Sequence, residues 1–258
     1  MKQYLALALA ALLLVGTLAS CVQADPNAID DYTPDIDYMV DEAGNTFYFE
    51  ETEGEGAILV KYVGKSTKDD RVKIPARFVV ESQGIDRTVV GIGDNVFRGL
   101  ASVVAVEIPA TVTSIGSQAF AGCTNLTSIT FPNGMLSIGS QAFANCDKLA
   151  SVSFGQSLES VGDHAFWHCT ALTAVTFPET LKTIGAGAFY HCTALASVNF
   201  PAGLESVGTL AFCNCLSLPE GVEDTIPATA KKGDFLFVID EELLTTEAVT
   251  DPAEEPAE

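Results

Sequence analysis

Five cysteines recur every 23 residues, and a sixth lies two positions before the last of them. Cysteines in exported proteins usually pair, and neighbours in stacked copies would lie within disulfide reach. Side chains in register on stacked copies point the same way, however, so we predict free, buried thiols that fill an apolar column. Cys213 falls in an outward slot and is the candidate for a reactive thiol or a disulfide. The regular cysteines are Cys123, Cys146, Cys169, Cys192 and Cys215.

Histidines and aromatic residues gather in the fourth and fifth of these copies. His164 and His168 are four apart, a spacing that binds metal on a helix, but the predicted turn is too short for one. His191 follows His168 by one period, and Trp167 and Tyr190 directly precede those two histidines. We expect a partly exposed rim and no metal site. Two interpretations stay open: the rim anchors a partner through its rings, or the rings only pack on one another.

The first 21 residues have the pattern of an export signal, with a lysine, an apolar run from residue 4 to 15, and small residues after it. The Leu-Ala-Ser-Cys run that ends at Cys21 resembles a bacterial lipoprotein lipobox. That resemblance implies cleavage before Cys21 and lipidation of its thiol. Cleavage after Ala24 is the alternative and would release an unlipidated chain. The apolar run is short for a membrane span, so we expect membrane contact through the lipid alone.

Charge and motif content argue against nucleic-acid binding and catalysis. The formal net charge of the 258 residues is −21, and a surface of that sign repels phosphate backbones. The sequence has no nucleophile-elbow glycine pattern, no phosphate-binding glycine loop and no paired-histidine metalloprotease motif. We therefore predict no catalytic residue, no cofactor and no metal, and a chain that is not an enzyme.

A glycine and a phenylalanine also recur every 23 residues, and they do so in six copies. A fixed period in the twenties is typical of a solenoid, in which each repeat buries its apolar side against its neighbours. Such a fold builds an extended surface. The repeated glycines are Gly93, Gly116, Gly139, Gly162, Gly185 and Gly208, and the phenylalanines are Phe97, Phe120, Phe143, Phe166, Phe189 and Phe212.

Each copy contains a strand signal. Leu126, Ile129 and Phe131 are spaced as L-x-x-L-x-L, and the last two alternate with polar residues, as in a strand with one buried face. A second extended piece ends at the repeated glycine, where we expect either a positive φ or a close backbone approach. An Ala-Phe pair then turns inward on one helical or 3₁₀ turn. The outward strand positions form the candidate binding face: Ser128, Thr130, Ser151, Ser153, Ala174, Thr176, Ser197 and Asn199.

The pattern from Ile115 to Pro132, Ile-Gly-x-x-Ala-Phe-x-x-Cys-x-x-Leu-x-x-Ile-x-Phe-Pro, resembles the BspA-type leucine-rich repeat. The resemblance implies a leucine-rich-repeat solenoid, mainly β, with stacked parallel strands. It also implies a surface protein, because members of this family are typically surface proteins of bacteria and some protists. Some members bind host matrix proteins or other cells. The chain departs from the family pattern at Leu100, at Gly155 and at the extra thiol of Cys213.

The composition divides the chain into five segments. The acidic residues 22–44 read as a flexible tether, and residues 45–91 as a small N-terminal β cap that covers the first repeat. The apolar run 235–239 is expected to pair with the last repeat before an acidic tail. The segments are a lipoprotein signal peptide at 1–21, the tether at 22–44, the β cap at 45–91, the six-copy solenoid at 92–218, and the cap strand with acidic tail at 219–258.

These features favour a non-enzymatic lipoprotein, lipid-anchored in the outer membrane at the cell surface. In this hypothesis the solenoid is a monomer and binds a protein or glycan partner, in adhesion to a host or between cells. The first alternative is a structural or self-associating scaffold of the envelope. The second is a hydrolase centred on the histidine rim.

Overall fold

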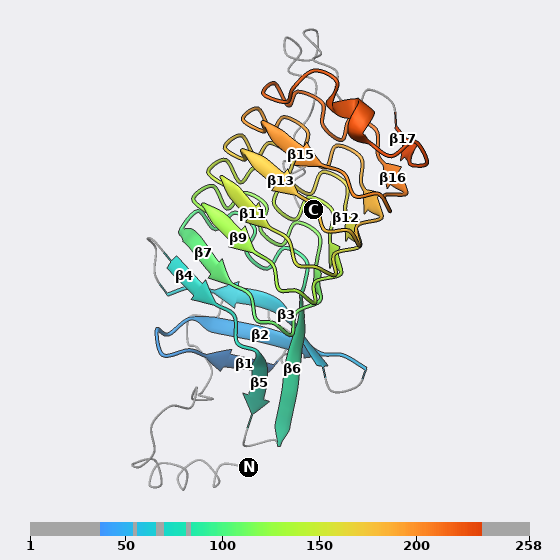
Figure 1. The fold of residues 1–258 in the computed structure, drawn as a ribbon. Coiled ribbons are helices and arrows are strands. Elements are labelled where there is room, and N and C mark those ends of the chain that lie inside the picture. Colours follow the sequence, from blue (N-terminus) through green and yellow to red (C-terminus); the bar gives the residue numbers. More distant parts are fainter. Residues whose placement is uncertain (1–36, 54–55, 66–69, 81–83, 234–258) are drawn as a thin grey trace, which may run out of the picture.

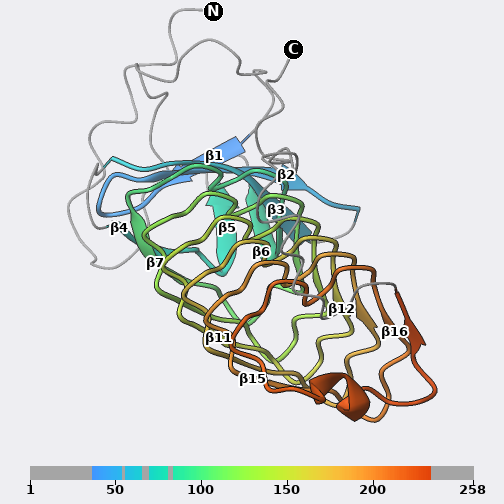
Figure 2. The same ribbon diagram turned by 90° about the horizontal axis from the view of Figure 1, so that it is seen from above.

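The computed structural model describes residues 37–53, 56–65, 70–80 and 84–233. These residues form a solenoid of stacked coils, each one 23-residue copy, with a β unit at its N-terminal end (Figure 1). Successive coils follow nearly the same outline one behind another (Figure 2). Within the described ranges the one helix is a 3₁₀ helix at Val222–Thr225. The predicted leucine-rich-repeat solenoid is confirmed.

The N-terminal unit begins earlier than predicted. Residues 37–44 were assigned to the tether, but they form strand β1 and a turn that pairs β1 antiparallel with β2. The predicted boundary at residue 44 is therefore wrong, and the β unit includes Asp37–Val40. In this unit β2 pairs antiparallel with β3, β3 pairs parallel with β6, and β5 pairs antiparallel with β6. The strands are β1 (Asp37–Val40), β2 (Thr46–Glu51), β3 (Gly56–Val63), β5 (Arg77–Val80) and β6 (Ile85–Ile92).

Beyond β6 the main sheet continues through the second extended piece of every coil. Each two-residue strand pairs in parallel with its neighbours, and residues at equivalent positions of adjacent coils lie opposite each other, as Ser137 does with Ser160. The sheet order β6-β8-β10-β12-β14-β16-β17 therefore runs the length of the solenoid. These strands are β8 (Ser114–Ile115), β10 (Ser137–Ile138), β12 (Ser160–Val161), β14 (Thr183–Ile184), β16 (Ser206–Val207) and β17 (Lys231–Lys232).

A second row of parallel strands carries the L-x-x-L-x-L segments. Ladder pairs join β4 to β7, β9 to β11 and β13 to β15. Single backbone bonds continue the row between those pairs, such as Thr173 N–H to Ala150 O at 3.3 Å. The strands are β4 (Asp70–Lys73), β7 (Val103–Glu107), β9 (Ser128–Thr130), β11 (Ser151–Ser153), β13 (Ala174–Thr176) and β15 (Ser197–Asn199).

The core between the two rows is a set of side-chain columns. The six repeated phenylalanines stack with centroid separations of 4.8–5.2 Å and rings within 8° of parallel. Tyr62 of β3 extends this column at the N-terminal end, 4.9 Å from Phe97. A second column, from Phe131 to Phe200, meets the first edge to face. The β unit thus caps the solenoid by continuing its aromatic column.

The repeated glycines serve a close backbone approach, which is one of the two roles expected. A β-carbon at Gly139 would lie 2.6 Å from the carbonyl carbon of Gly116 in the preceding coil, closer than real contacts allow. Positive φ occurs instead at two other positions of every coil, such as Gln118 at 54° and Gly122 at 73°. The coils can therefore stack closely at this corner only because it lacks a side chain.

The Ala-Phe turn differs from a helical turn. Two i to i+3 hydrogen bonds close it, from Ala121 N–H to Gln118 O and from Cys123 N–H to Phe120 O, both 3.1 Å long. The left-handed residues at Gln118 and Gly122 interrupt the right-handed backbone, so consecutive turns form and no helix does. At the C-terminal end β17 pairs with β16, while the predicted cap strand 235–239 lies outside the described residues.

Candidate binding face

The eight outward strand positions lie side by side on β9, β11, β13 and β15, and all of them are exposed. The residues between them point inward, and Ile129 and Val175 are 2% and 1% exposed. We call this surface the strand face. Six of the eight side chains are hydroxyls, which can both donate and accept hydrogen bonds, and none is charged. Its chemistry suits hydrogen-bonded contact with a polar ligand and offers no acid, base or nucleophile activated by a neighbour.

Sequence reasoning missed the first two strands of the strand face. Strand β4 pairs with β7 so that Arg71 lies opposite Ala105 and Lys73 opposite Glu107. Ala105 and Glu107 precede Ser128 and Thr130 by one period, so the same two rows of side chains continue onto β4. Because β4 lies outside the 23-residue period, the repeat gave no sign of it. The available sequence signal was the alternation of charged and apolar residues in Arg71-Val72-Lys73-Ile74.

These first strands give the strand face a charged end. Lys73 and Glu107 form an ion pair of 3.3 Å, and their side chains are 75% and 67% exposed. A pair so exposed contributes little to stability. Arg71 is exposed and has no ionic partner among the described residues. The strand face therefore begins with an available guanidinium and continues as a neutral hydroxyl surface.

At the opposite end one predicted face residue is already engaged. The Asn199 side chain accepts the Phe177 N–H through Oδ1 at 2.7 Å and donates to Phe177 O through Nδ2 at 3.2 Å. This side chain satisfies both backbone groups of Phe177, the residue directly after β13. Asn199 remains exposed, but its amide is committed to the fold.

The predicted exposure of Trp167 and Tyr190 is wrong. Each is 8% exposed, and the two rings stack with 6.5 Å between centroids. They belong to a second apolar cluster along the turns, here called the turn edge, in which small residues of earlier coils leave room for the large rings. The buried members of the turn edge are Ala121, Ala144, Trp167, Tyr190 and Cys213.

The prediction that Cys213 lies outward, as a candidate for a reactive thiol or a disulfide, is also wrong, because Cys213 forms no disulfide among the described residues and is buried. It is 0% exposed inside the turn edge. At this repeat position the side chains of neighbouring coils cover one another along the turns. The exposure of a residue there therefore depends on the size of the side chains at the same position in the adjacent coils. Cys213 therefore lacks the solvent access that a reactive thiol requires.

The three histidines occupy left-handed backbone positions. The φ angles of His164, His168 and His191 are 54°, 58° and 60°. Other coils place Asn, Gln, Gly or Leu in these slots, as at Asn145 and Leu210, both with φ of 58°, and at Gly122 with φ of 73°. Histidine is among the few residues enriched in this conformation. The backbone of the turn thus accounts for their presence without any metal or catalytic role.

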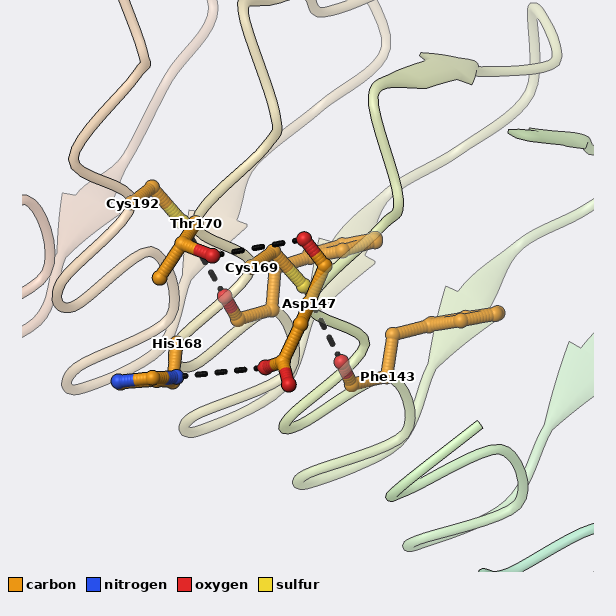
Figure 3. Close-up of polar contacts among 7 residues, drawn as sticks. Phe143, Asp147, His168, Cys169, Thr170 and Cys192 are labelled. Carbon is orange, nitrogen blue, oxygen red and sulfur yellow. Dashed lines mark hydrogen bonds and ion pairs between the residues drawn. The ribbon is translucent and has the colours of Figure 1, made fainter. Parts of the chain in front are cut away.

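His168 and His191 nevertheless interact closely. Their rings stack with centroids 4.8 Å apart and an interplanar angle of 4°. His168 Nδ1 lies 3.5 Å from Asp147 Oδ1 of the preceding coil (Figure 3). Burial, and secondarily the neighbouring His168, lower the pKa of His191. Over the described ranges no three metal-ligating side chains gather in a cluster.

The regular cysteines are free and buried, and each thiol has a hydrogen-bond acceptor. Cys169 Sγ donates to Phe143 O in the preceding coil at 3.2 Å (Figure 3), and the other four repeat this bond at 3.1–3.2 Å. Burial raises the pKa of Cys123 to about 12 and raises those of Cys146, Cys169 and Cys192. These four thiols therefore stay protonated, and thiolate chemistry is closed to them.

A shallow groove of about 710 Å³ runs along the glycine corner, away from the strand face. Its walls are small hydroxyl residues such as Ser160 and Thr183, and Lys231 and Lys232 lie at its end. The described part of the chain contains no helix long and apolar enough to cross a membrane. Cys21, the predicted lipidation site, lies outside the described residues.

Comparison with known proteins matches this geometry to one family. The family profile described as BspA type Leucine rich repeat region matches residues 90–219 in six copies. A T. pallidum Leucine Rich Repeat protein (TpLRR) is 29% identical with a TM-score of 0.63, and the match covers 74% of this chain and 97% of that protein. A leucine rich cell surface protein from Faecalibacterium prausnitzii A2-165 is 29% identical with a TM-score of 0.64, covering 78% of this chain and 51% of its own. This chain spans about half the length of the latter. No curated protein matches the sequence.

Proposed function

Because the chain belongs to the BspA-type leucine-rich-repeat family, we propose that it is a non-enzymatic surface protein whose strand face binds a protein or glycan partner. The observation that carries the proposal is the strand face, which is continuous, exposed and uncharged from β9 to β15 in a chain with a net charge of −21. Flat solenoid faces of this kind present many weak contacts in register, and together these bind an extended partner. The similar Faecalibacterium protein is described as a cell surface protein, which supports the same location here.

The proposed anchor is a lipid on Cys21. The signal pattern and the Leu-Ala-Ser-Cys run support it, and the acidic residues that follow would hold the solenoid away from the membrane. Palmitate labelling of wild type and Cys21→Ser tests the anchor, and protease shaving of intact cells tests surface exposure. Unlabelled wild-type protein would end the lipid proposal, and protection from the protease would end the surface proposal.

Charge placed on the strand face tests the binding role. Ser151→Glu combined with Thr176→Glu adds two carboxylates at exposed positions and removes hydroxyls without touching the core. The matched control is Ser140→Glu combined with Thr209→Glu, which are also exposed but lie beside the glycine corner, away from the strand face. Binding of each purified protein to a glycan array and to immobilised matrix proteins is measured. We expect the strand-face variant to lose at least about tenfold in affinity, because two carboxylates must be desolvated at the contact and two hydroxyl hydrogen bonds are lost. Equal binding by both variants would reject the strand face as the site.

The alternative role as a self-associating scaffold has a structural feature against it. At the C-terminal end, the last strand of the main sheet among the described residues is β17, whose two residues are exposed lysines. Lysines on an edge strand discourage further strand addition. Light scattering after size-exclusion chromatography is expected to give a monomer, and a concentration-dependent oligomer would restore the scaffold role.

A further inference from the structure

The strand face has one charged end, at strands β4 and β7. Arg71 of β4 lies opposite Ala105 of β7, and Ala105 precedes Ser128 by one period. One row of side chains therefore runs from Arg71 over β7, β9, β11 and β13 to β15 (Figure 1). Neighbouring strands lie about 4.8 Å apart, so this row is about 24 Å long. The Arg71 side chain is exposed at the beginning of the row, beside a residue as small as alanine.

The other charged groups at this end are already engaged. Lys73 and Glu107, in the second row, form an ion pair of 3.3 Å. The carboxylate of Asp70 lies on the inner face of β4, where the residue is 7% exposed and accepts a hydrogen bond from Ser102 Oγ at 3.0 Å. Arg71 has no ionic partner among the described residues. An anion on the strand face therefore meets a guanidinium fork, which binds a carboxylate through two parallel hydrogen bonds.

The rest of the strand face favours a glycan over a protein as the partner. Protein interfaces draw most of their binding energy from a few large anchors, mainly Trp, Tyr and Arg, which lie near the centre of the contact. From β9 to β15 the outward side chains are Ser, Thr, Ala and Asn, so the centre of the strand face has no such anchor. Its hydroxyls recur at the strand spacing, and a chain of sugar rings likewise carries hydroxyl groups along its whole length. The two surfaces can therefore exchange many hydrogen bonds.

The placement of charge on the strand face limits the acid to one end of that glycan. The eight outward residues from β9 to β15 include no cation. A carboxylate bound over these strands would lose its water without gaining an opposite charge, which is costly. A carboxylate bound over β4 meets Arg71. A glycan with an acid on every sugar therefore fits the face poorly, and a wholly neutral glycan leaves the guanidinium without a ligand.

We propose that the partner is an oligosaccharide whose terminal sugar carries a carboxylate, with that carboxylate on the Arg71 guanidinium and neutral sugars along β9 to β15. This inference rests on the proposed function of the strand face and adds the chemical class of the ligand. Arg71 selects the acidic glycan, and the hydroxyl rows supply the rest of the contact. The charged end also fixes the direction in which the glycan lies along the solenoid.

The experiment measures binding of the full chain to lacto-N-tetraose, a linear neutral oligosaccharide, with and without a terminal sialic acid, by titration calorimetry. We expect wild type to bind the sialylated form at least about tenfold more tightly, because hydrogen bonds between charged groups are the strong ones. Arg71→Ala should lower the affinity for the sialylated form by about tenfold and leave that for the neutral form unchanged. An oligogalacturonate, with a carboxylate on every sugar, should bind more weakly than the sialylated form.

Arg77→Ala is the matched control, because it removes the same charge from β5, outside the strand face, where Arg77 pairs with Asp86 at 2.6 Å. Both arginines are exposed, so neither substitution touches the core. The control should leave both affinities unchanged. Arg71→Lys keeps the charge and loses the fork, so we expect a loss of about threefold for the sialylated form. Equal binding of the two oligosaccharides by wild type, binding of neither, equal effects of Arg71→Ala and Arg77→Ala, or tighter binding of the oligogalacturonate would each overturn the proposal.

The outcomes also separate this inference from the proposed function. If Ser151→Glu with Thr176→Glu abolishes binding and Arg71→Ala does not weaken it, the strand face is the site and the terminal acid is wrong. If wild type binds an immobilised matrix protein through the strand face and neither oligosaccharide, the proposed function stands and the glycan is wrong. If the double variant binds the sialylated form as wild type does, the strand face fails as the site, and this inference fails with it.

Discussion

The strand face and the turn edge are two different sides of the same coils, and they relate residue type to exposure in opposite ways. The strand face exposes small polar residues, and strand alternation requires that exposure. The turn edge buries Trp167 and Tyr190 at 8% exposure, although their slot holds alanine in earlier coils. The difference shows that the exposure of a strand residue is set by the alternation of side chains along the strand. The exposure of a turn residue is set by the side chains at the same position in the neighbouring coils.

The largest expected effect tests the core that both sides share. Phe143 stacks between Phe120 and Phe166, 5.0 and 5.2 Å away, and is fully buried. We expect Phe143→Ala to reduce the free energy of unfolding by about 3–5 kcal/mol, because it leaves a cavity and weakens two interfaces between coils. Ser153→Ala on the strand face should change it by less than about 0.5 kcal/mol. Urea denaturation measures both, and similar values for the two would refute the column.

The next effect tests the turn edge directly. Trp167→Ala should cost about 3 kcal/mol of unfolding free energy, because the indole is buried against Tyr190 and Ala144. The same substitution at a solvent-exposed tryptophan would cost well under 1 kcal/mol. Trp167 is the one tryptophan of the chain, so its fluorescence in the native state reports burial independently. A red-shifted native spectrum quenched by iodide would contradict the buried turn edge.

A smaller effect is expected at the glycine corner. Gly139→Ala places a methyl group against the Gly116 backbone, and we expect a loss of about 1–3 kcal/mol from forced separation of two coils. Gly134→Ala is the matched control, since its β-carbon would meet nothing closer than Ala110 O at 3.8 Å. Melting temperatures of the two variants give the comparison. A Gly139→Ala protein as stable as Gly134→Ala would show that the coils tolerate a side chain at the corner.

The smallest effect concerns pH. Because the folded state lowers the pKa of His191, the unfolded chain binds the proton more readily. The contribution of His191 is therefore fully present above the unfolded value of about 6.5 and is lost as pH falls through the folded pKa. His191→Asn, which copies Asn214 one coil later, should reduce the loss of stability between pH 7.5 and pH 5. Equal losses in variant and wild type, measured by urea denaturation, would contradict this assignment.

How far the sequence predicted the structure follows from the period itself. Successive copies of a solenoid repeat are related by a shift along its axis. Because Phe120 and Phe143 hold the same position in adjacent copies, their rings stack, and Ser128 and Ser151 lie on the same face for the same reason. The period could not predict the burial of Trp167, because its slot changes from alanine to large rings along the array. Nor could it reveal β4, which joins the strand face from outside the repeat.

The uniform register also has a consequence for how such a protein changes size. Each coil presents to the next the same surface that it receives from the one before, as Ser137 pairs with both Ser114 and Ser160. Loss or duplication of one 23-residue unit would therefore rejoin matching strand rows and core columns and leave the N-terminal β unit in place. The length of the solenoid is thus adjustable in steps of about 4.8 Å, and the turn edge is the part of each coil whose contacts would change.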